Sequence, residues 1–290
     1  MSKTRRHIQI CIGIFLLHLI GRNGTHMKIT SFKTIILSIL LIGNMIGVKG
    51  QQNVDIFTPN KQTPMYQNNV LIELFTSEGC SSCPLADAFM KDIIHLSDST
   101  KTPVYVIDYH VDYWNRSGWI DPFSDSLYTQ RQIAICKQKN EAKLFTPMAF
   151  VNGGKALSGS DKKSVGIQIT QNLAKPNPNF LKIDVSAIPG EDSLIVAYKL
   201  WGPTDSLEFY AALVQVEINN SVTAGENKDK ILQHHNVCKQ LQHIPITVEK
   251  GQLKMYIPQT INLDNYRLIG FAQHKGNLEI RGVDQLTFKP

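Results

Sequence analysis

The sequence has no apolar run as long as the ~20 residues that a membrane-spanning helix needs, and it has no internal repeat or low-complexity tract. The hydrophobic fraction is 42% over 290 residues, which is enough for a globular core and too evenly spread for a polytopic membrane protein. A chain of this length forms one large domain or two ordinary ones. We therefore expect a globular protein with a substantial apolar core.

Acidic residues are absent from the first 50 positions, which contain seven of the 30 Lys and Arg residues. The other 23 basic residues lie in 51–290 together with all 24 Asp and Glu residues, so this part of the chain is close to neutral. A protein that binds nucleic acid carries a basic patch on its folded part. We therefore expect no nucleic-acid partner.

Residues 1–50 have the pattern of a targeting segment rather than of a fold. Two apolar runs, Ile8–Ile20 and Ile35–Val48, are separated by polar residues. The second run follows lysines and ends next to Gly50, which is typical of a signal peptide. We predict cleavage near Gly50, with Met27 as an alternative start of the protein.

An uncleaved membrane anchor is the alternative interpretation of this segment. Under both interpretations, residues 51–290 are exported, to the periplasm or to the outside of the cell. Disulfides persist in such compartments.

The rest of the chain divides by its hydrophobic pattern. Residues 51–68 are polar and contain prolines, as expected of a linker. Strand and helix patterns alternate over 69–175, whereas strand patterns separated by turn residues dominate 180–290, with one helical insertion near 228–243. We predict an α/β domain over 69–175 followed by a mainly β domain over 180–290.

Apolar periodicity and turn residues place the individual elements. In the first domain we predict strands at 70–75, 103–110 and 148–152, a hairpin return at 155–158, and helices at 82–96, 124–140 and 161–173. In the second domain we predict strands at 180–187, 193–200, 208–217 and 266–274.

Cys80 and Cys83 form a Cys-x-x-Cys pair between the strand at 70–75 and the helix that follows it. At a helix N-terminus, unpaired N–H groups and the helix dipole favour a thiolate over a thiol. A second sulfur one turn later can attack a mixed disulfide and release the partner. We predict a redox-active pair with Cys80 as nucleophile and Cys83 as resolving thiol; a static structural disulfide is the alternative.

The sequence contains three further cysteines. Cys11 would leave with the targeting segment. Cys136 and Cys238 would then either pair with each other or remain two isolated buried thiols, and the sequence leaves both alternatives open.

Glu73 lies on the strand that precedes the cysteine pair. If this side chain is buried, desolvation raises its pKa and it can accept the proton of Cys83. The alternative is a glutamate at a strand edge that faces water.

The order of elements around the cysteine pair, with Thr146-Pro147 before the third strand, resembles the thioredoxin fold. The resemblance implies that Pro147 is a cis proline beside the dithiol. It also implies that Thr146 and Pro147 form a platform for a bound peptide substrate. Glu73 matches the buried acid of thioredoxins only approximately, because it lies one residue further from the dithiol.

The chain is also similar to a family of secreted thioredoxin-like proteins catalogued as a domain of unknown function. The motifs that carry this similarity are ELFTSEGCSSCPLAD (73–87), HVDYWNRSGWIDPF (110–123), RQ (131–132), TPMAFVNG (146–153) and AGENKDKILQHHNV (224–237). The resemblance implies a thioredoxin-like fold and a redox class of activity, but no substrate. Cys136 and Cys238 depart from the family pattern.

His110 and Trp114 belong to an aromatic segment that we expect near the dithiol. They would line a substrate cleft there; the alternative is that the aromatic residues close the edge of a core. His110 with the two cysteines would also form a soft ligand set suited to Cu(I). His234 and His235 are adjacent and point to different faces of the predicted helix, so we expect them to share no metal ion.

The favoured function is an exported thiol–disulfide oxidoreductase that acts on the thiols and disulfides of exported proteins. It would exchange electrons with an unidentified redox partner and would need no metal and no cofactor besides the Cys80–Cys83 disulfide. The alternative is a non-enzymatic binding protein for copper, another metal or a ligand, in which the disulfide is structural.

Overall fold

The computed structural model describes residues 68–187, 191–257 and 261–288. The predicted targeting segment, with its cleavage site and alternative start, and all but the last residue of the predicted linker lie outside the described residues. Within them, no helix is both long enough and apolar enough to cross a bilayer.

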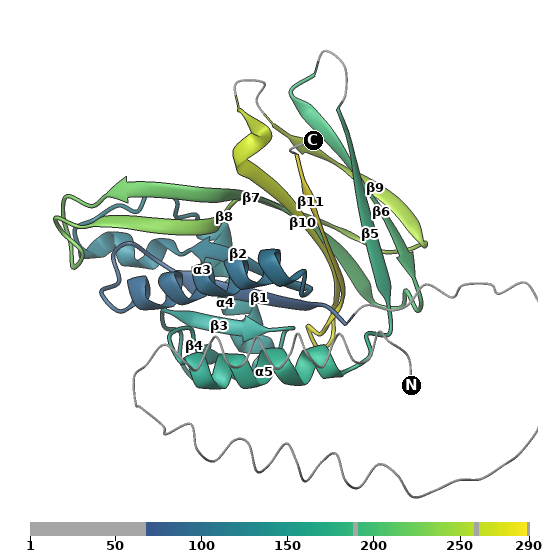
Figure 1. Cartoon of the computed structure of the whole chain (residues 1–290), viewed down its shortest axis with the longest axis horizontal. Coiled ribbons are helices and arrows are strands. Elements are labelled where there is room, and N and C mark those ends of the chain that lie inside the picture. The colour runs from purple at the N-terminus through teal and green to yellow at the C-terminus, as the bar shows by residue number, and fades with distance from the viewer. Residues whose placement is uncertain (1–67, 188–190, 258–260, 289–290) are drawn as a thin grey trace, which may run out of the picture.

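The elements of the described chain follow one another in two parts (Figure 1). The N-terminal part contains β1 (Val70–Thr76), α3 (Cys83–Thr100), β2 (Val104–His110), the 3-10 helix η2 (Asp112–Ser117), α4 (Ser126–Lys139), β3 (Met148–Val151), β4 (Leu157–Ser158) and α5 (Lys162–Ala174). The C-terminal part contains β5 (Phe180–Ala187), β6 (Ser193–Trp201), β7 (Leu207–Ser221), β8 (Ile231–Pro245), β9 (Lys250–Tyr256), the 3-10 helix η3 (Leu263–Asn265), β10 (Tyr266–His274) and β11 (Ile280–Thr287).

Most of these elements agree with the sequence-based predictions, because apolar periodicity marks a side that faces a core. The strands predicted at 180–187 and 266–274 coincide with β5 and β10. Asp161 caps α5, with its side chain accepting a hydrogen bond from the Ser164 amide at 3.0 Å. The segment near 228–243 was predicted to be helical, and this prediction is wrong, because the segment forms β8.

An eight-stranded sheet runs through both parts of the chain, in the order β11-β10-β7-β8-β2-β1-β3-β4. β1 pairs in parallel with β2 and antiparallel with β3. β7 and β8 form a long antiparallel hairpin, and β8 bridges to β2 at Asp108 and Val237. The free edge of β2 is therefore occupied by a strand from the C-terminal part.

The predicted fold class, a thioredoxin-like α/β domain followed by a mainly β domain, is therefore wrong. The protein is mainly β, and strands β7, β8, β10 and β11 continue the sheet begun by β1 to β4. The physical reason is that the β7–β8 hairpin is long enough to reach across the molecule and cover the edge of β2. Local pattern cannot reveal such pairing between distant segments.

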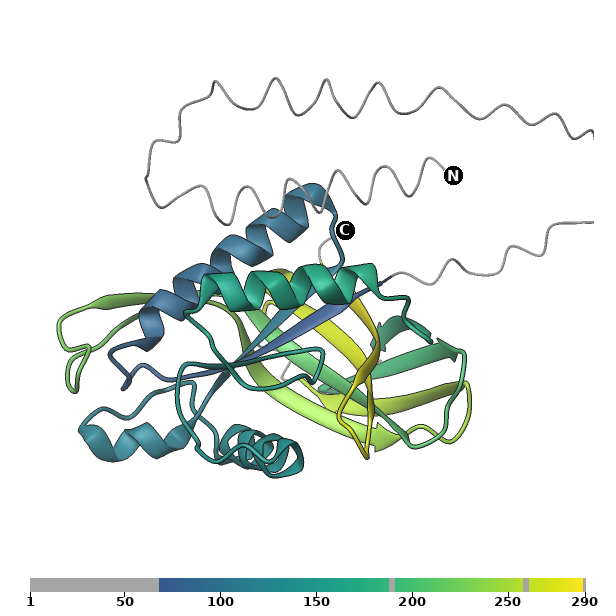
Figure 2. The ribbon, with the colours of Figure 1, turned by 90° about the horizontal axis from the view of Figure 1, so that it is seen from below.

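Helices cover both faces of the β1–β2 region. α3 and α5 lie on one side of the strands and α4 lies on the other (Figure 2). Because successive side chains of a strand point to opposite faces, Ile72 and Leu74 pack with α3 and α5, whereas Leu71 and Phe75 pack with Tyr128 and other residues of the α4 side.

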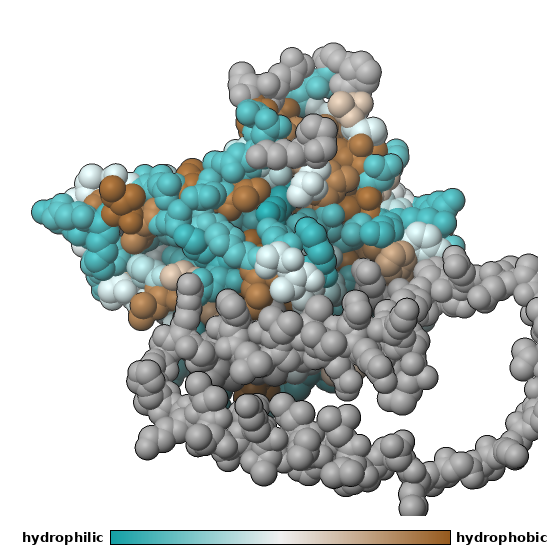
Figure 3. Space-filling model, in the orientation of Figure 1, coloured by the Kyte–Doolittle hydropathy of each residue, from teal (hydrophilic) through white to brown (hydrophobic). Residues whose placement is uncertain are grey.

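A second sheet, in the order β5-β6-β9, packs on the far end of the large sheet. Its apolar residues form a separate core with β7 and β10, in which Tyr198 and Phe209 have ring centroids 4.7 Å apart. On the face drawn in Figure 3, hydrophobic residues gather mainly over this end, whereas the part around the β7–β8 hairpin is mostly hydrophilic.

A buried ion pair joins α4 to the large sheet. Arg131 Nε donates to Glu73 Oε1 at 2.6 Å, and both side chains are nearly inaccessible to solvent. The guanidinium group lies over the rings of Tyr210 on β7 and Phe271 on β10, at 4.8 and 5.4 Å from their centroids. One side chain thus connects β1 with two strands from the C-terminal part.

We predict that Arg131→Ala lowers the free energy of unfolding by about 3–5 kcal/mol, because it leaves the Glu73 carboxylate buried without its partner. Urea denaturation followed by circular dichroism measures this loss. The control is Lys137→Ala, an exposed position on the same helix, which should change stability by less than ~0.5 kcal/mol. An equal effect of both variants would show that the ion pair does not hold α4 to the sheet.

Candidate functional site: a buried disulfide beside a polar cluster

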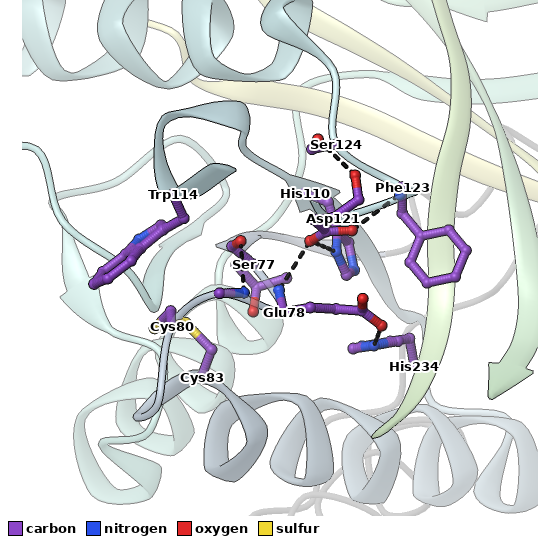
Figure 4. Close-up of polar contacts among 12 residues, drawn as sticks. Ser77, Glu78, Cys80, Cys83, His110, Trp114, Asp121, Phe123, Ser124 and His234 are labelled. Carbon is purple, nitrogen blue, oxygen red and sulfur yellow. Dashed lines mark hydrogen bonds and ion pairs between the residues drawn. A yellow bond between two sulfur atoms is a disulfide. The ribbon is translucent and has the colours of Figure 1, made fainter. Parts of the chain in front are cut away.

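The Cys-x-x-Cys segment forms the turn between β1 and α3. The Cys80 amide donates to the Ser77 carbonyl at 3.1 Å and the Cys83 amide donates to the Cys80 carbonyl at 3.2 Å. Cys83 is the first residue of α3, and a disulfide joins it to Cys80 with a Cα–Cα distance of 5.4 Å. The structure thus contains the bond between the two predicted sulfurs, at the helix N-terminus where the sequence places it (Figure 4).

Both cysteines are covered although the two residues between them are not. Cys80 is 1% exposed and Cys83 is fully buried, whereas Ser81 and Ser82 are exposed. Cys80 Sγ lies 3.4 Å from the Ser82 hydroxyl oxygen. The disulfide therefore lies directly beneath the surface rather than on it.

Trp114 and Thr146, two of the predicted substrate-binding residues, lie together beside this turn. Trp114 Nε1 donates to Thr146 Oγ1 at 2.7 Å. A Cβ atom added to Gly79 would lie only 3.1 Å from Trp114 Cβ, so residue 114 packs directly against the turn. Pro147 follows with a cis peptide bond, as predicted, and comes close to α3, since an added Cβ on Gly159 would touch both Pro147 and Ala86.

The tip of the β7–β8 hairpin also contacts the turn. Asn227 is fully buried, and its side-chain amide donates to the carbonyls of Glu78 and Cys80, each at 2.9 Å. The Ser81 amide donates to Glu226 Oε2 at 2.9 Å. Sequence reasoning did not assign these residues a role. The GEN motif within 224–237 was the signal that marked them, but only the fold places it on the disulfide turn.

Glu78, two residues before Cys80, has a fully buried carboxyl group with donors from three distant segments. Trp119 Nε1 donates to Glu78 Oε2 at 2.8 Å, and Asn220 donates to both carboxyl oxygens at 2.9 and 3.1 Å. His234 Nε2 lies 3.1 Å from Glu78 Oε1. A buried carboxylate is tolerated only when it is paired in this way.

His110 was predicted to line a cleft near the dithiol, and the structure places it in this buried cluster. Its Nδ1 lies 2.7 Å from Asp121 Oδ2, and its ring meets that of His234 edge to face, with centroids 4.7 Å apart. The same Asp121 oxygen accepts from the Glu78 amide at 2.8 Å. His110 is thus linked to the disulfide turn through Asp121 and Glu78, and it is not a neighbour of Cys80 (Figure 4).

Burial and mutual charge shift the pKa values of this cluster strongly. Burial raises the pKa of Asp108 to about 8, and the negative charge of Asp87 adds to that rise. Burial by itself lowers the pKa of His234, but the nearby carboxylates of Asp87 and Glu78 outweigh this and raise the value to about 10. Burial would raise the pKa of Asp121, but the charge and hydrogen bond of His110 and two backbone amides lower it to about 2.

Glu73 does not belong to the buried cluster of carboxylates and histidines. It alternates on β1 with residues that face α3, so its side chain points to the α4 side, where it pairs with Arg131. The structure therefore does not bring Glu73 to Cys83, which lies on α3. The alternative of an edge glutamate facing water does not apply either, because Glu73 is 1% exposed.

Cys136 and Cys238 are both buried and both free. They belong to the same core cluster, and their nearest sulfur contact is between Cys136 Sγ and the Met148 thioether, at 3.5 Å. Burial raises the pKa of Cys238 to about 12 and also raises that of Cys136. Of the two alternatives left open by the sequence, the structure has isolated thiols.

We predict that neither Cys136 nor Cys238 reacts with iodoacetamide at pH 8 in the native protein, because a thiol with a raised pKa stays protonated and unreactive. Both should become alkylated after unfolding in urea. Peptide mapping by mass spectrometry checks this. A Cys136–Cys238 bridge found in protein that was never reduced would contradict the arrangement.

We also predict that Asn227→Ala speeds the reduction of Cys80–Cys83 by dithiothreitol by roughly tenfold or more, because two buried carbonyl groups of the turn lose a donor worth about 1–3 kcal/mol. Trapping free thiols over time gives the rate. Asn219→Ala, at an exposed position of β7, is the control. Equal rates in both variants would mean that the hairpin tip does not shield the turn.

The fold and the site together define a mainly β protein with a shielded Cys-x-x-Cys disulfide next to a buried cluster of carboxylates and histidines. The chain matches the family described as "Protein of unknown function (DUF1223)" over residues 71–273 and belongs to it. The match covers β1 through β10, and so includes every residue of the site described above.

Solved structures are similar to this chain over different extents, and the first of these two agrees with it in fold. A structural-genomics protein from Agrobacterium tumefaciens is 20% identical with a TM-score of 0.58, over 76% of this chain and 94% of that one. A domain of the outer membrane lipoprotein Omp28 from Porphyromonas gingivalis is 10% identical with a TM-score of 0.24, over 39% and 97% of the two chains. No curated protein matches the chain.

Proposed function

We propose that the protein is an exported thiol–disulfide oxidoreductase that uses Cys80 and Cys83 on protein thiols and disulfides. The observation that carries this proposal is the Cys80–Cys83 disulfide at the first residue of α3, next to the Trp114–Thr146 pair. Export rests on the N-terminal targeting pattern of residues 1–50.

The chemistry requires a sulfur that ionises easily and a neighbour that can close a ring with it. α3 has 18 residues, and its N-terminal N–H groups and dipole stabilise a thiolate formed at the turn. No acidic residue lies in the first turn of α3 to oppose this effect. The Cα atoms of Cys80 and Cys83 lie 5.4 Å apart, within the range that a disulfide spans.

The exchange proceeds in two displacement steps. The Cys80 thiolate attacks one sulfur of a substrate disulfide, bonds to it and expels the other substrate sulfur as a thiolate. The Cys83 thiolate then attacks Cys80 Sγ, forms the Cys80–Cys83 bond and expels the first substrate sulfur. Two electrons pass from the protein to the substrate, and a partner dithiol restores the reduced protein. The reverse steps oxidise a substrate dithiol.

Access to Cys80 requires that part of its cover moves, since the residue is 1% exposed. Ser81 and Ser82, which lie between the two cysteines, are exposed to solvent. A peptide bound against Trp114 and Thr146 would lie next to the turn, whose backbone Asn227 holds through the Cys80 carbonyl. In this proposal, Trp114 and Thr146 position the substrate peptide.

The alternative function, a copper carrier using Cys80, Cys83 and His110, finds less support. The two cysteines are bonded to each other, and His110 faces Asp121 and His234. Within the described ranges, the group whose ligand atoms converge is Asp108, His110 and His234, which contains no cysteine.

We predict that Cys80→Ser abolishes thiol–disulfide exchange with glutathione disulfide, by roughly 100-fold or more, because the nucleophile is lost. Cys83→Ser should instead accumulate a mixed disulfide between Cys80 and glutathione, which intact-mass spectrometry detects. Cys136→Ser, which removes a buried free thiol elsewhere, is the matched control and should behave as the unchanged protein. If all three variants exchange at the same rate, the disulfide is structural and the proposal fails.

A further inference from the structure

The buried cluster beside the disulfide contains three ring or carboxyl atoms that point toward one another without a hydrogen-bond partner. Among the described residues, Asp108 Oδ1, His110 Nε2 and His234 Nδ1 are buried and unpartnered. One ligand atom from each of these residues lies within 4.8 Å of the others. Because an unpaired buried polar group is costly, three of them at one point call for a shared partner.

The fold brings the three residues together from distant positions. Asp108 and His110 alternate on β2 and therefore point to the same face. His234 comes from β8, the strand that bridges to β2. All three residues are at most 1% exposed.

Each histidine is oriented as a metal ligand usually is. His110 Nδ1 is held by Asp121 at 2.7 Å, and His234 Nε2 is held by Glu78 at 3.1 Å, so the other ring nitrogen of each histidine faces the centre of the cluster, where carboxylate oxygens of Asp108 and Asp87 lie 3.9 and 3.4 Å away. Metal-binding histidines almost always use their second nitrogen in this way, bonded to a carboxylate that fixes the ring. The structure contains two such carboxylate–histidine pairs whose other ring nitrogens converge.

A carboxylate oxygen of Asp87 is close enough to be the fourth ligand. Asp87 Oδ2 lies 3.4 Å from His234 Nδ1, and Asp108 Oδ2 lies 3.9 Å from His110 Nε2. Four carboxyl groups surround two imidazoles here, so the surroundings favour a cation. Ligands around a tetrahedral zinc ion are about 3.3 Å apart, so the side chains need to move inward by less than ~1 Å each.

We propose that Asp108, His110 and His234, with Asp87 as fourth ligand, bind one divalent transition-metal ion of the Zn²⁺ class. Nitrogen and oxygen ligands in this ratio suit Zn²⁺ and its spectroscopic substitute Co²⁺. A set of four protein ligands is that of a structural site, so the ion stabilises the contact between the β7–β8 hairpin and the disulfide turn. The inference is independent of the redox proposal, because neither cysteine is a ligand.

The test is a Co²⁺ and Zn²⁺ titration of the full chain after treatment with chelator, with Cys80–Cys83 kept oxidised. We expect one equivalent to bind, with a visible Co²⁺ spectrum of nitrogen and oxygen ligands that lacks thiolate charge-transfer bands. Elemental analysis of protein purified with added Zn²⁺ should give the same stoichiometry. Zn²⁺ should also raise the thermal midpoint, because it binds the folded state.

The diagnostic variants are His234→Gln and Asp108→Asn, which should weaken Co²⁺ binding by roughly 100-fold or more. The matched control is His235→Gln: this neighbouring histidine is also buried with both ring nitrogens unpartnered, but it meets His95 rather than His110. The control should bind as the unchanged protein does.

Three results would overturn the proposal. The first is that the unchanged protein binds less than one equivalent of Co²⁺ or Zn²⁺. The second is that the His234→Gln and His235→Gln variants bind the metal equally well. The third is a Co²⁺ spectrum that contains thiolate bands. The first would mean that the cluster is a network of protonated imidazoles and carboxylates. The stoichiometry and spectrum of the unchanged protein decide the question even if a variant fails to fold.

Discussion

The burial of the Glu78 carboxyl group is the constraint on which the rest of the site depends. A carboxylate without access to water needs donors from the protein, and an unpaired one costs several kcal/mol. Trp119, Asn220 and His234 supply these donors, and they come from a loop and from both strands of the β7–β8 hairpin. The hairpin can therefore dock only where Glu78 lies, two residues before Cys80.

This docking also explains why the protein has one large sheet. Once its tip is fixed at the disulfide turn, the hairpin runs along the edge of β2, and β8 bridges to it at Asp108. On the opposite face, Arg131 pairs with Glu73 and packs on Tyr210 and Phe271. Polar groups buried on both faces thus join the N-terminal and C-terminal parts of the chain.

Local sequence pattern predicted much of the fold, for identifiable reasons. β1, α3 and β2 have apolar residues at strand or helix spacing, and Asp161 caps α5 as its position suggests. β8 was predicted as a helix because its buried positions include His234 and Asn236, whose polar side chains hide the pattern of a buried strand. These residues are buried because Glu78 and a carbonyl of β2 bond to them, and only the tertiary structure contains that information.

Some residues of the candidate site could likewise be predicted from the sequence, whereas others could not. Cys80 and Cys83 were found from spacing and context, Trp114 from its place in an aromatic segment, and Thr146 through the resemblance to thioredoxins. That resemblance suggested a fold class that is wrong, although Thr146 does lie with Trp114 beside the turn. Glu78, Asp121 and His234 lie within the motifs that carry the family similarity, but no local pattern shows that they meet, because they come together only when three distant segments fold.

The most direct test of the account is the equilibrium between the protein and a series of glutathione redox buffers, followed by thiol trapping and by near-ultraviolet circular dichroism. The account predicts that Cys80–Cys83 opens and closes reversibly at a defined ratio while the folded spectrum is unchanged. Reduction that occurs only together with the loss of the folded spectrum would contradict it, because the disulfide would then be a structural bridge.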